Sequence, residues 1–159
     1  MALMLLISII SQLAAGEVQT AHLTFRAGSS PETYNLTVKA DGSVIETGHD
    51  TLPVSHIDAP DYLARSLCHF QTPRAVNLST TVASDGITQQ VVLNPVQPVL
   101  SVRCEGRCVY TYGACYDTDN QFVGPCCNGL CVATRCRAWN LGHHHHHHHH
   151  HHRHHHHGE

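Results

Sequence analysis

Charged side chains are scarce in this sequence. Asp, Glu, Lys and Arg make up 13% of its 159 residues, where ~25% is usual, and Lys39 is the single lysine. Acidic residues outnumber Lys and Arg by 12 to 9, which gives a net charge of −3 with His neutral. These numbers exclude a nucleic-acid-binding protein built on a basic surface, and they exclude a highly charged disordered chain.

The patterns of long helices and of catalytic sites are also missing. No run of ten or more residues keeps a helical period, and no nucleophile elbow, phosphate loop, HExxH or paired-carboxylate signature occurs. His49-Asp50 and His56-Ile57-Asp58 each place a histidine close to a carboxylate, but such pairs are common on surfaces and neither has a defined catalytic geometry. We therefore expect a protein that is not an enzyme and requires no cofactor.

One long apolar run is present, at residues 2–10, where ALMLLISII is followed by SQLAAG. It is long enough for the apolar region of a signal peptide and shorter than the ~20 residues that cross a bilayer. We expect residues 1–16 to be a signal peptide, cleaved after Ala15 or Gly16, and the protein to be secreted. No second apolar stretch approaches ~20 residues, so the sequence predicts no transmembrane segment.

Residues 17–103 predict a β-rich module. Apolar and polar residues alternate from Tyr34 to Lys39, and Asp41-Gly42 predicts a tight hairpin turn before the pattern resumes. The same arrangement recurs from Val76 to Leu93 around Asp85-Gly86. We expect two antiparallel hairpins in an all-β module, most plausibly a small β-sandwich.

The remaining segments of this module are less regular. His22 to Arg26 predicts a further short strand. Three prolines make residues 48–73 irregular, with one helical turn expected over 59–65. Pro95 and Pro98 make residues 96–102 an edge strand or a connector.

Two glycosylation sequons agree with secretion, Asn35-Leu36-Thr37 and Asn77-Leu78-Ser79. Both asparagines fall on the polar side of their predicted strands, so a glycan on either would point into solvent. The eight cysteines, an even number, predict disulfides formed in an oxidising compartment.

Six of the cysteines lie within residues 108–136, separated by gaps of six, ten, zero, three and four residues. A segment this short, with few large apolar side chains, cannot bury enough surface to offset its chain entropy, and each disulfide contributes typically ~2–4 kcal/mol. Asn128-Gly129 predicts the turn of a short hairpin. Zinc is the competing interpretation of clustered cysteines, which the signal peptide and the adjacent pair Cys126-Cys127 both oppose.

Six cysteines with a central adjacent pair, and the string GPCCNGLC, resemble the inhibitor cystine-knot framework of spider and cone-snail toxin knottins and of plant C6-type antimicrobial peptides. Counting alone permits ~105 pairings of eight cysteines. The resemblance implies a knottin-like unit over residues 104–139, with a fourth disulfide that joins it to the β-rich module. The implied pairs are Cys108–Cys127, Cys115–Cys131, Cys126–Cys136 and Cys68–Cys104.

Aromatic side chains are the candidate partner-binding residues of this unit. With little core to bury them, some should be exposed and anchor a partner, and Trp139 is the one we expect to be most exposed; packing over the disulfides or against the β-rich module is the alternative. Between Cys104 and Gly142, three arginines are balanced by three carboxylates, unlike the cationic toxins, which disfavours membrane lysis. The candidates are Tyr110, Tyr112, Tyr116, Phe122 and Trp139.

Residues 140–159 predict a flexible His-rich tail, which is either an expression tag or, as we favour, an encoded low-complexity segment. Neutral imidazoles bind Cu²⁺, Ni²⁺ and Zn²⁺ where neighbouring rings converge, and most would be protonated by about pH 5. A cleavage after Ala21 would expose a further copper ligand, the amine of His22, but lies far beyond the apolar run. The candidate metal ligands of the tail are His143, His144, His145, His146, His147, His148, His149, His150, His151, His152, His154, His155, His156 and His157.

The layout as a whole is similar to that of fungal small secreted cysteine-rich proteins, some of which act as effectors on a host. The leading hypothesis is a secreted, non-enzymatic, effector- or toxin-like protein that binds an extracellular protein or membrane target, with no nucleic-acid partner. The alternatives are metal sequestration by the tail and a membrane-active antimicrobial function.

Overall fold

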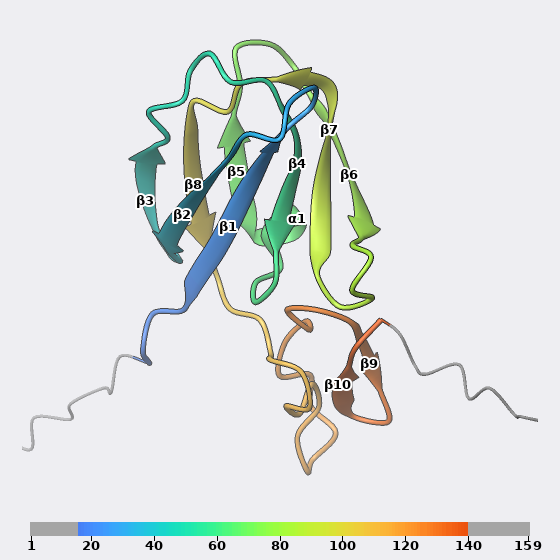
Figure 1. Ribbon diagram of the computed structural model, residues 1–159. Coiled ribbons are helices and arrows are strands. Elements are labelled where there is room, and N and C mark those ends of the chain that lie inside the picture. Colours follow the sequence, from blue (N-terminus) through green and yellow to red (C-terminus); the bar gives the residue numbers. More distant parts are fainter. Residues whose placement is uncertain (1–15, 140–159) are drawn as a thin grey trace, which may run out of the picture.

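The computed structural model describes residues 16–139. Within this range the chain forms two antiparallel sheets that lie face to face, with a smaller disulfide-linked unit at one end of them (Figure 1). The large sheet has five strands in the order β2-β1-β4-β7-β6, and the small sheet has three in the order β3-β8-β5. The predicted all-β class and sandwich-like arrangement are therefore confirmed.

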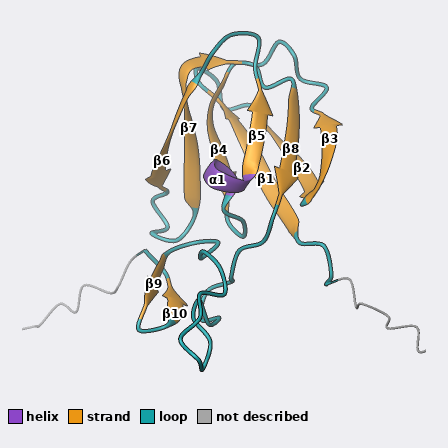
Figure 2. Cartoon of the chain, turned by 180° about the vertical axis from the view of Figure 1, so that it is seen from behind, coloured by secondary structure: helices purple, strands orange, loops and turns teal. Residues whose placement is uncertain are grey.

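The strands of the large sheet are β1 (Thr20–Ala27), β2 (Thr33–Lys39), β4 (Val54–Ala59), β6 (Asn77–Val82) and β7 (Gln89–Gln97). Those of the small sheet are β3 (Asp41–Glu46), β5 (Cys68–Gln71) and β8 (Ser101–Glu105). The short helix α1 (Ala64–Leu67) leads into β5 and contacts β5, β6 and β8 (Figure 2). We call residues 106–139, which follow β8, the C-terminal unit; it contains the hairpin of β9 (Leu130–Val132) and β10 (Arg135–Arg137).

Alternating residues on the facing strands form the core. In β1, Leu23 and Phe25 are buried, whereas His22 is exposed. This alternation follows the period of two in a strand. Phe25 stacks on Tyr34 of β2, with ring centroids 4.5 Å apart, and meets Phe70 of β5 edge-on at 6.4 Å. Such aromatic pairs contribute ~0.5–1.5 kcal/mol beyond their buried area. The first pair lies within the large sheet, and the contact of Phe25 with Phe70 joins the two sheets.

One of the two predicted hairpins is present. β6 and β7 pair along the whole length of β6, with Asp85-Gly86 in the turn between them. The other prediction was wrong, because β2 pairs with β1 and β3 pairs with β8. Asp41-Gly42 instead begins a strand of the opposite sheet, and Gly42 adopts the positive φ of 83° that this change of direction needs.

Two segments are more regular than the sequence predicts. Residues 48–73 contain β4 and β5, and the helical turn lies at Ala64–Leu67 rather than over 59–65. Residues 96–102 contain the end of β7 and the start of β8, and β8 is the central strand of the small sheet, not an edge. In β4 the last three residues are all buried, including Asp58, so the alternation that would reveal a strand is lost.

Candidate interaction surface on the C-terminal unit

Three disulfides hold the C-terminal unit together, and they join its cysteines first to fourth, second to fifth and third to sixth. The bonds are Cys108–Cys127, Cys115–Cys131 and Cys126–Cys136, the pairs that the cystine-knot resemblance implies. The sulfur atoms of Cys115, Cys126 and Cys136 lie within 4.8 Å of one another. Because all three are oxidised, they offer no thiolate to a metal ion.

The fourth disulfide joins Cys68 to Cys104, as implied, but it does not connect the two units. Cys68 lies in β5 directly opposite Cys104 in β8, so the bond cross-links two strands of the small sheet. The expectation that it fastens the C-terminal unit to the β-rich module was wrong, because β8 continues through Glu105 and carries Cys104 with it.

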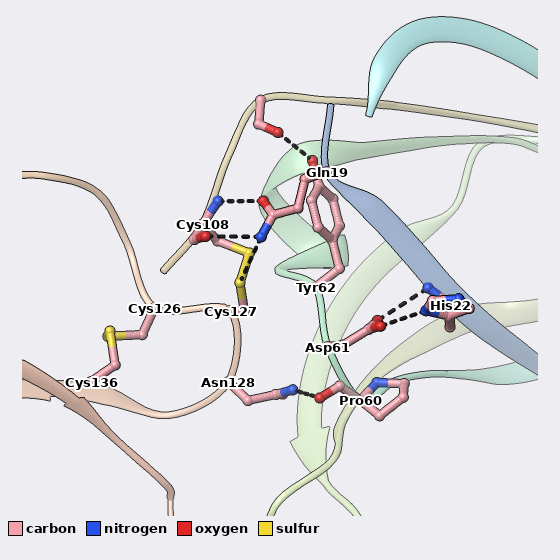
Figure 3. The surroundings of a disulfide bond; sticks show 11 residues. Gln19, His22, Pro60, Asp61, Tyr62, Cys108, Cys126, Cys127, Asn128 and Cys136 are labelled. Atoms are coloured by element: carbon pink, nitrogen blue, oxygen red, sulfur yellow. Dashed lines mark hydrogen bonds and ion pairs between the residues drawn. A yellow bond between two sulfur atoms is a disulfide. The ribbon is translucent and has the colours of Figure 1, made fainter. Parts of the chain in front are cut away.

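Gln19 makes the attachment that this disulfide was expected to make. Its side-chain Oε1 accepts the backbone N–H of Cys108 at 2.9 Å, and its Nε2 donates to the carbonyl of Cys108 at 3.0 Å (Figure 3). The carbonyl of Gln19 accepts the N–H of Ala40 at 2.8 Å. The residue just before β1 is therefore bonded both to the large sheet and to the C-terminal unit.

Two further side chains complete the attachment. Asn128 accepts the N–H of Gln89 at 3.1 Å through Oδ1 and donates to the carbonyl of Pro60 through Nδ2 (Figure 3). The hydroxyl of Tyr62 donates to the carbonyl of Gly106 at 3.0 Å. Burial raises the pKa of Tyr62, and the nearby Glu105 carboxylate adds to the rise, so this hydroxyl stays a donor at neutral pH.

The adjacent cysteines of the CC pair belong to different cores. Cys127 and its partner Cys108 are buried in the main core between the sheets and the C-terminal unit, whereas Cys126 and its partner Cys136 form a second, small core with Cys115. The C-terminal unit is thus packed onto the β-rich module and cross-linked internally, which holds its surface in a fixed orientation.

The predicted aromatic residues divide between exposed and half-buried positions. Tyr110, Tyr112 and Phe122 are exposed, with Tyr112 the most exposed at 65%. Tyr116 is half-buried and meets Phe122 edge-on, with ring centroids 5.4 Å apart. Trp139 is also half-buried, with its indole Nε1 buried, so the expectation that it would be the most exposed was wrong.

One face of the β9–β10 hairpin gathers apolar and cationic side chains. In the antiparallel register Leu130 lies opposite Arg137 and Val132 opposite Arg135, so these four side chains share a face. Leu130 and Val132 are exposed, although sequence reasoning did not single them out. We call these four residues together with Tyr112 the β9–β10 face.

Tyr112 joins this face through both arginines. The guanidinium carbon of Arg137 lies 5.7 Å from the centroid of the Tyr112 ring, within the range of a cation–π contact. Arg135 donates from Nη1 to the Tyr112 carbonyl at 2.9 Å. Neither arginine has an ion-pair partner among residues 16–139, where the ion pairs are His22–Asp61 and Arg26–Asp58, so both cationic groups are available to a partner.

The turn that builds this face differs from the predicted one. Ala133 and Thr134, with φ of 48° and 68°, form the two-residue turn between β9 and β10. Asn128-Gly129, the predicted turn, precedes β9 instead. Gly129 has a φ of 100°, and a Cβ there would collide with the Arg137 carbonyl oxygen, so this glycine allows the strand end to approach closely.

The two His–Asp pairs of the sequence are not brought together. His49 stacks on Tyr34 with ring centroids 4.0 Å apart. The Nδ1 of His56 lies 2.8 Å from the Ser55 hydroxyl, while Asp58 binds Arg26.

The structure forms a different pair, with the Nδ1 of His22 at 2.5 Å from Asp61. Thirty-nine residues separate these two, so no local pattern could reveal the contact. A chain beginning at His22 would lose the buried Ala21 and the contacts of Gln19, which argues against the alternative cleavage after Ala21.

Several predicted residues remain to be placed. Asn35 and Asn77 are exposed on β2 and β6. The predicted signal peptide, apart from its last residue, and the fourteen histidines of the tail lie outside the described residues. Across residues 16–139 no helix is long and apolar enough to span a bilayer. No protein-family model, curated protein or solved structure matches this chain.

Proposed function

We propose that this protein is a secreted, effector- or toxin-like interaction protein that acts without catalysis and binds a target outside the producing cell through its β9–β10 face. Four disulfides are typical of an extracellular protein. The observation that carries the proposal is the exposure of Tyr112, Leu130 and Val132 beside two arginines that have no carboxylate partner within residues 16–139. Tyrosine and arginine are the residue types that most often dominate binding energy at interfaces.

The rigid attachment of the C-terminal unit supports this assignment. Hydrogen bonds from Gln19, Tyr62 and Asn128 and the burial of Cys108–Cys127 fix the unit on the sandwich. A preorganised surface loses little conformational entropy when it binds. The two arginines favour a target with an acidic surface, because complementary charge steers association and selects the partner.

The test is the affinity of the oxidised protein, labelled at one site, for intact candidate target cells. Leu130→Ser and Tyr112→Ser should each weaken binding by about tenfold, as is usual for residues at the centre of an interface. Val44→Ser is the matched control, because Val44 is 60% exposed on β3, away from the β9–β10 face. If all three variants bind as the unchanged protein does, the β9–β10 face is not the binding surface.

A protein target and a membrane target are distinguished with protein-free vesicles. Arginines beside Leu, Val and Tyr also suit an anionic lipid surface, so vesicles with and without anionic lipid are compared, and dye leakage is followed at pH 5 and pH 7. We expect a protein target, and therefore cell binding that survives an excess of anionic vesicles. Leakage, or competition by the vesicles, would favour the membrane-active alternative.

Metal sequestration by the tail is the second candidate function, and it rests on the fourteen histidines among the last seventeen residues. Deletion of residues 143–159 separates the two candidates. Cell binding should be unchanged by the deletion if the β9–β10 face carries the function, whereas a metal-dependent effect on target cells should be lost with the tail.

A further inference from the structure

The two sequons occupy equivalent places at opposite borders of the large sheet. Asn35 lies in β2 and Asn77 in β6, and the order β2-β1-β4-β7-β6 makes these the edge strands. Asn35 is opposite Thr24 of β1, and Asn77 is opposite Asn94 of β7. Their neighbours along each strand turn toward the core, so both asparagines project from the outward face of the sheet.

These two edges carry little of the usual protection against pairing with another molecule. An edge strand presents unpaired N–H and C=O groups, which proteins commonly block with charged side chains, prolines or very short strands. In the small sheet, β3 begins and ends with a carboxylate and β5 has four residues. By contrast, β6 contains no charged residue, and β2 contains a single one, Lys39 at its end.

Arg65 of α1 marks which backbone groups of β6 face its free edge. Arg65 of α1 donates from Nε to the carbonyl of Leu78 at 3.0 Å, so the backbone groups of Leu78 face away from β7. Because these groups alternate along an antiparallel strand, those of Thr80 and Val82 face the same open side. Val82 is exposed, and the strand NLSTTV is uncharged and rich in β-branched residues, a composition that favours added strands.

We infer that N-linked glycans on Asn77 and Asn35 block the free edges of the large sheet against pairing with a second copy of this protein. An added strand would lie ~4.8 Å from the edge strand, within reach of a branched oligosaccharide that projects from the outward face of that same strand. At β2, the Oδ1 of Asn35 accepts the Thr24 hydroxyl at 2.7 Å, which leaves Nδ2, the atom that carries the sugar, on the side away from β1.

The same placement keeps the glycans away from the C-terminal unit. β6 begins, at Asn77, at the end of the sandwich remote from that unit (Figure 1). The sugars therefore border the outward face of the large sheet, while the surface of the C-terminal unit remains open to a partner.

The test compares variants of the full chain secreted from cells that attach N-linked glycans. Intact mass should show a glycan on both sites of the unchanged protein, and light scattering should show a monomer. The pair Thr37→Ala with Ser79→Ala removes both sequons and should self-associate to at least twice the monomer mass as concentration rises. The pair Thr37→Lys with Ser79→Lys removes the same sequons but adds a charge to each edge strand, and should remain a monomer.

Each opposite result overturns the inference. An unglycosylated Asn77 in the secreted protein would remove its basis, and an alanine pair that stays monomeric would show that the edges need no cover. Lysine variants that associate as strongly as the alanine variants would show that the contact lies elsewhere. If the alanine pair is not secreted, the native protein is trimmed by an endoglycosidase to one sugar per site and used in its place. Trimming that leaves self-association unchanged would also contradict the inference.

Discussion

Gln19 and Cys108, eighty-nine residues apart, are joined by two hydrogen bonds in which a side-chain amide takes the place of a neighbouring strand. The Gln19 amide accepts the N–H of Cys108 at 2.9 Å and donates to its carbonyl at 3.0 Å. The segment that leads into β1 thus positions the first cysteine of the C-terminal unit. Correct docking of that unit therefore depends on the segment that precedes β1.

We expect Gln19→Ala to lower the free energy of unfolding by about 1–3 kcal/mol, because it leaves a part-buried donor and acceptor of Cys108 without partners. Gln19→Glu is the matched variant: its carboxylate can accept the N–H but cannot donate to the carbonyl. Denaturant unfolding measures both, and amide exchange at Cys108 reports the local effect. Equal stability of Gln19→Ala and the unchanged protein would contradict the prediction.

Arg26 and Asp58 form an ion pair, and we expect loss of Arg26 to lower the free energy of unfolding more than loss of the Asp58 charge. The Asp58 side chain is 11% exposed and that of Arg26 is 50% exposed; the hydrogen bond and charge of Asp58 raise the pKa of Arg26. Arg26→Ala leaves a buried carboxylate with Gln90 as its remaining side-chain donor. It should lower the free energy of unfolding by about 3 kcal/mol. Asp58→Asn leaves an arginine that can turn into water and should cost about 1 kcal/mol. Urea denaturation of the two variants checks the order, and the reverse order would be incompatible with this account.

Tyr34 predicts a loss of stability at high pH. Burial raises the pKa of Tyr34 to about 12, and the nearby Thr47 hydroxyl opposes part of that rise. The unfolded chain ionises near pH ~10, so the contribution of Tyr34 to stability is present below that pH and is lost as pH rises toward 12. Spectrophotometric titration should find one tyrosine that resists ionisation until about pH 12.

Tyr34→Phe separates the ring of Tyr34 from its hydroxyl. Among the described residues the hydroxyl is buried without a hydrogen bond of ordinary geometry. The substitution should therefore change the free energy of unfolding at pH 7 by less than about 1 kcal/mol. It should also reduce the alkaline loss of stability to the part that Tyr62 contributes. Tyr34→Leu, which also removes the stacking on Phe25 and His49, should cost about 2 kcal/mol.

Asp85 predicts a response at low pH. A hydrogen bond from the Thr88 hydroxyl, together with the backbone N–H groups of Ile87 and Thr88, lowers the pKa of Asp85. Its contribution is therefore present above the unfolded pKa near ~4 and disappears as pH falls through the lower folded value. Asp85→Asn should have a lower Tm than the unchanged protein at pH 7, and the gap should close in strong acid. A gap that stays constant across the pH range would assign the effect to something other than this carboxylate.

The tail predicts metal binding that depends on pH. The full chain should be retained on immobilised Ni²⁺ at pH 7 and released below about pH 5.5, because protonated imidazole cannot bind a metal. A chain ending at Gly142 should not be retained. Equal retention of the shortened chain would move the metal site into the folded part.

Local patterns predicted those features whose cause is local. The alternation around Asp85-Gly86 predicts the β6–β7 hairpin, and the same alternation predicts the exposure of Asn77. The hairpin predicted at Asp41-Gly42 was wrong because a tight turn can have the same sequence in two cases. The next strand can return along its own sheet or cross to the other sheet. The strand β4 was missed because Asp58 is buried by a partner thirty-two residues away, and only the tertiary fold supplies that partner.

The candidate surface could be predicted only in part. The aromatic content of the C-terminal unit predicts exposed Tyr112, but Leu130 and Val132 join it through the register of β9 and β10. That register depends on a turn at Ala133-Thr134, two residues that seldom adopt positive φ. Trp139 is half-buried rather than exposed, and composition alone does not distinguish these two positions.

Cys126 and Cys127 are adjacent in the chain but lie in different cores, and this affects which residues of the C-terminal unit can be substituted. Cys127 is buried in the main core and helps to attach the C-terminal unit to the sandwich, whereas Cys126 lies in the small core inside the unit. Attachment and internal cross-linking therefore depend on different disulfides. The exposed side chains of Tyr110 and Val123 belong to neither core. Natural variants and laboratory libraries should therefore tolerate replacement at Tyr110 and Val123 without loss of secretion, and the unit can acquire new targets on an unchanged support.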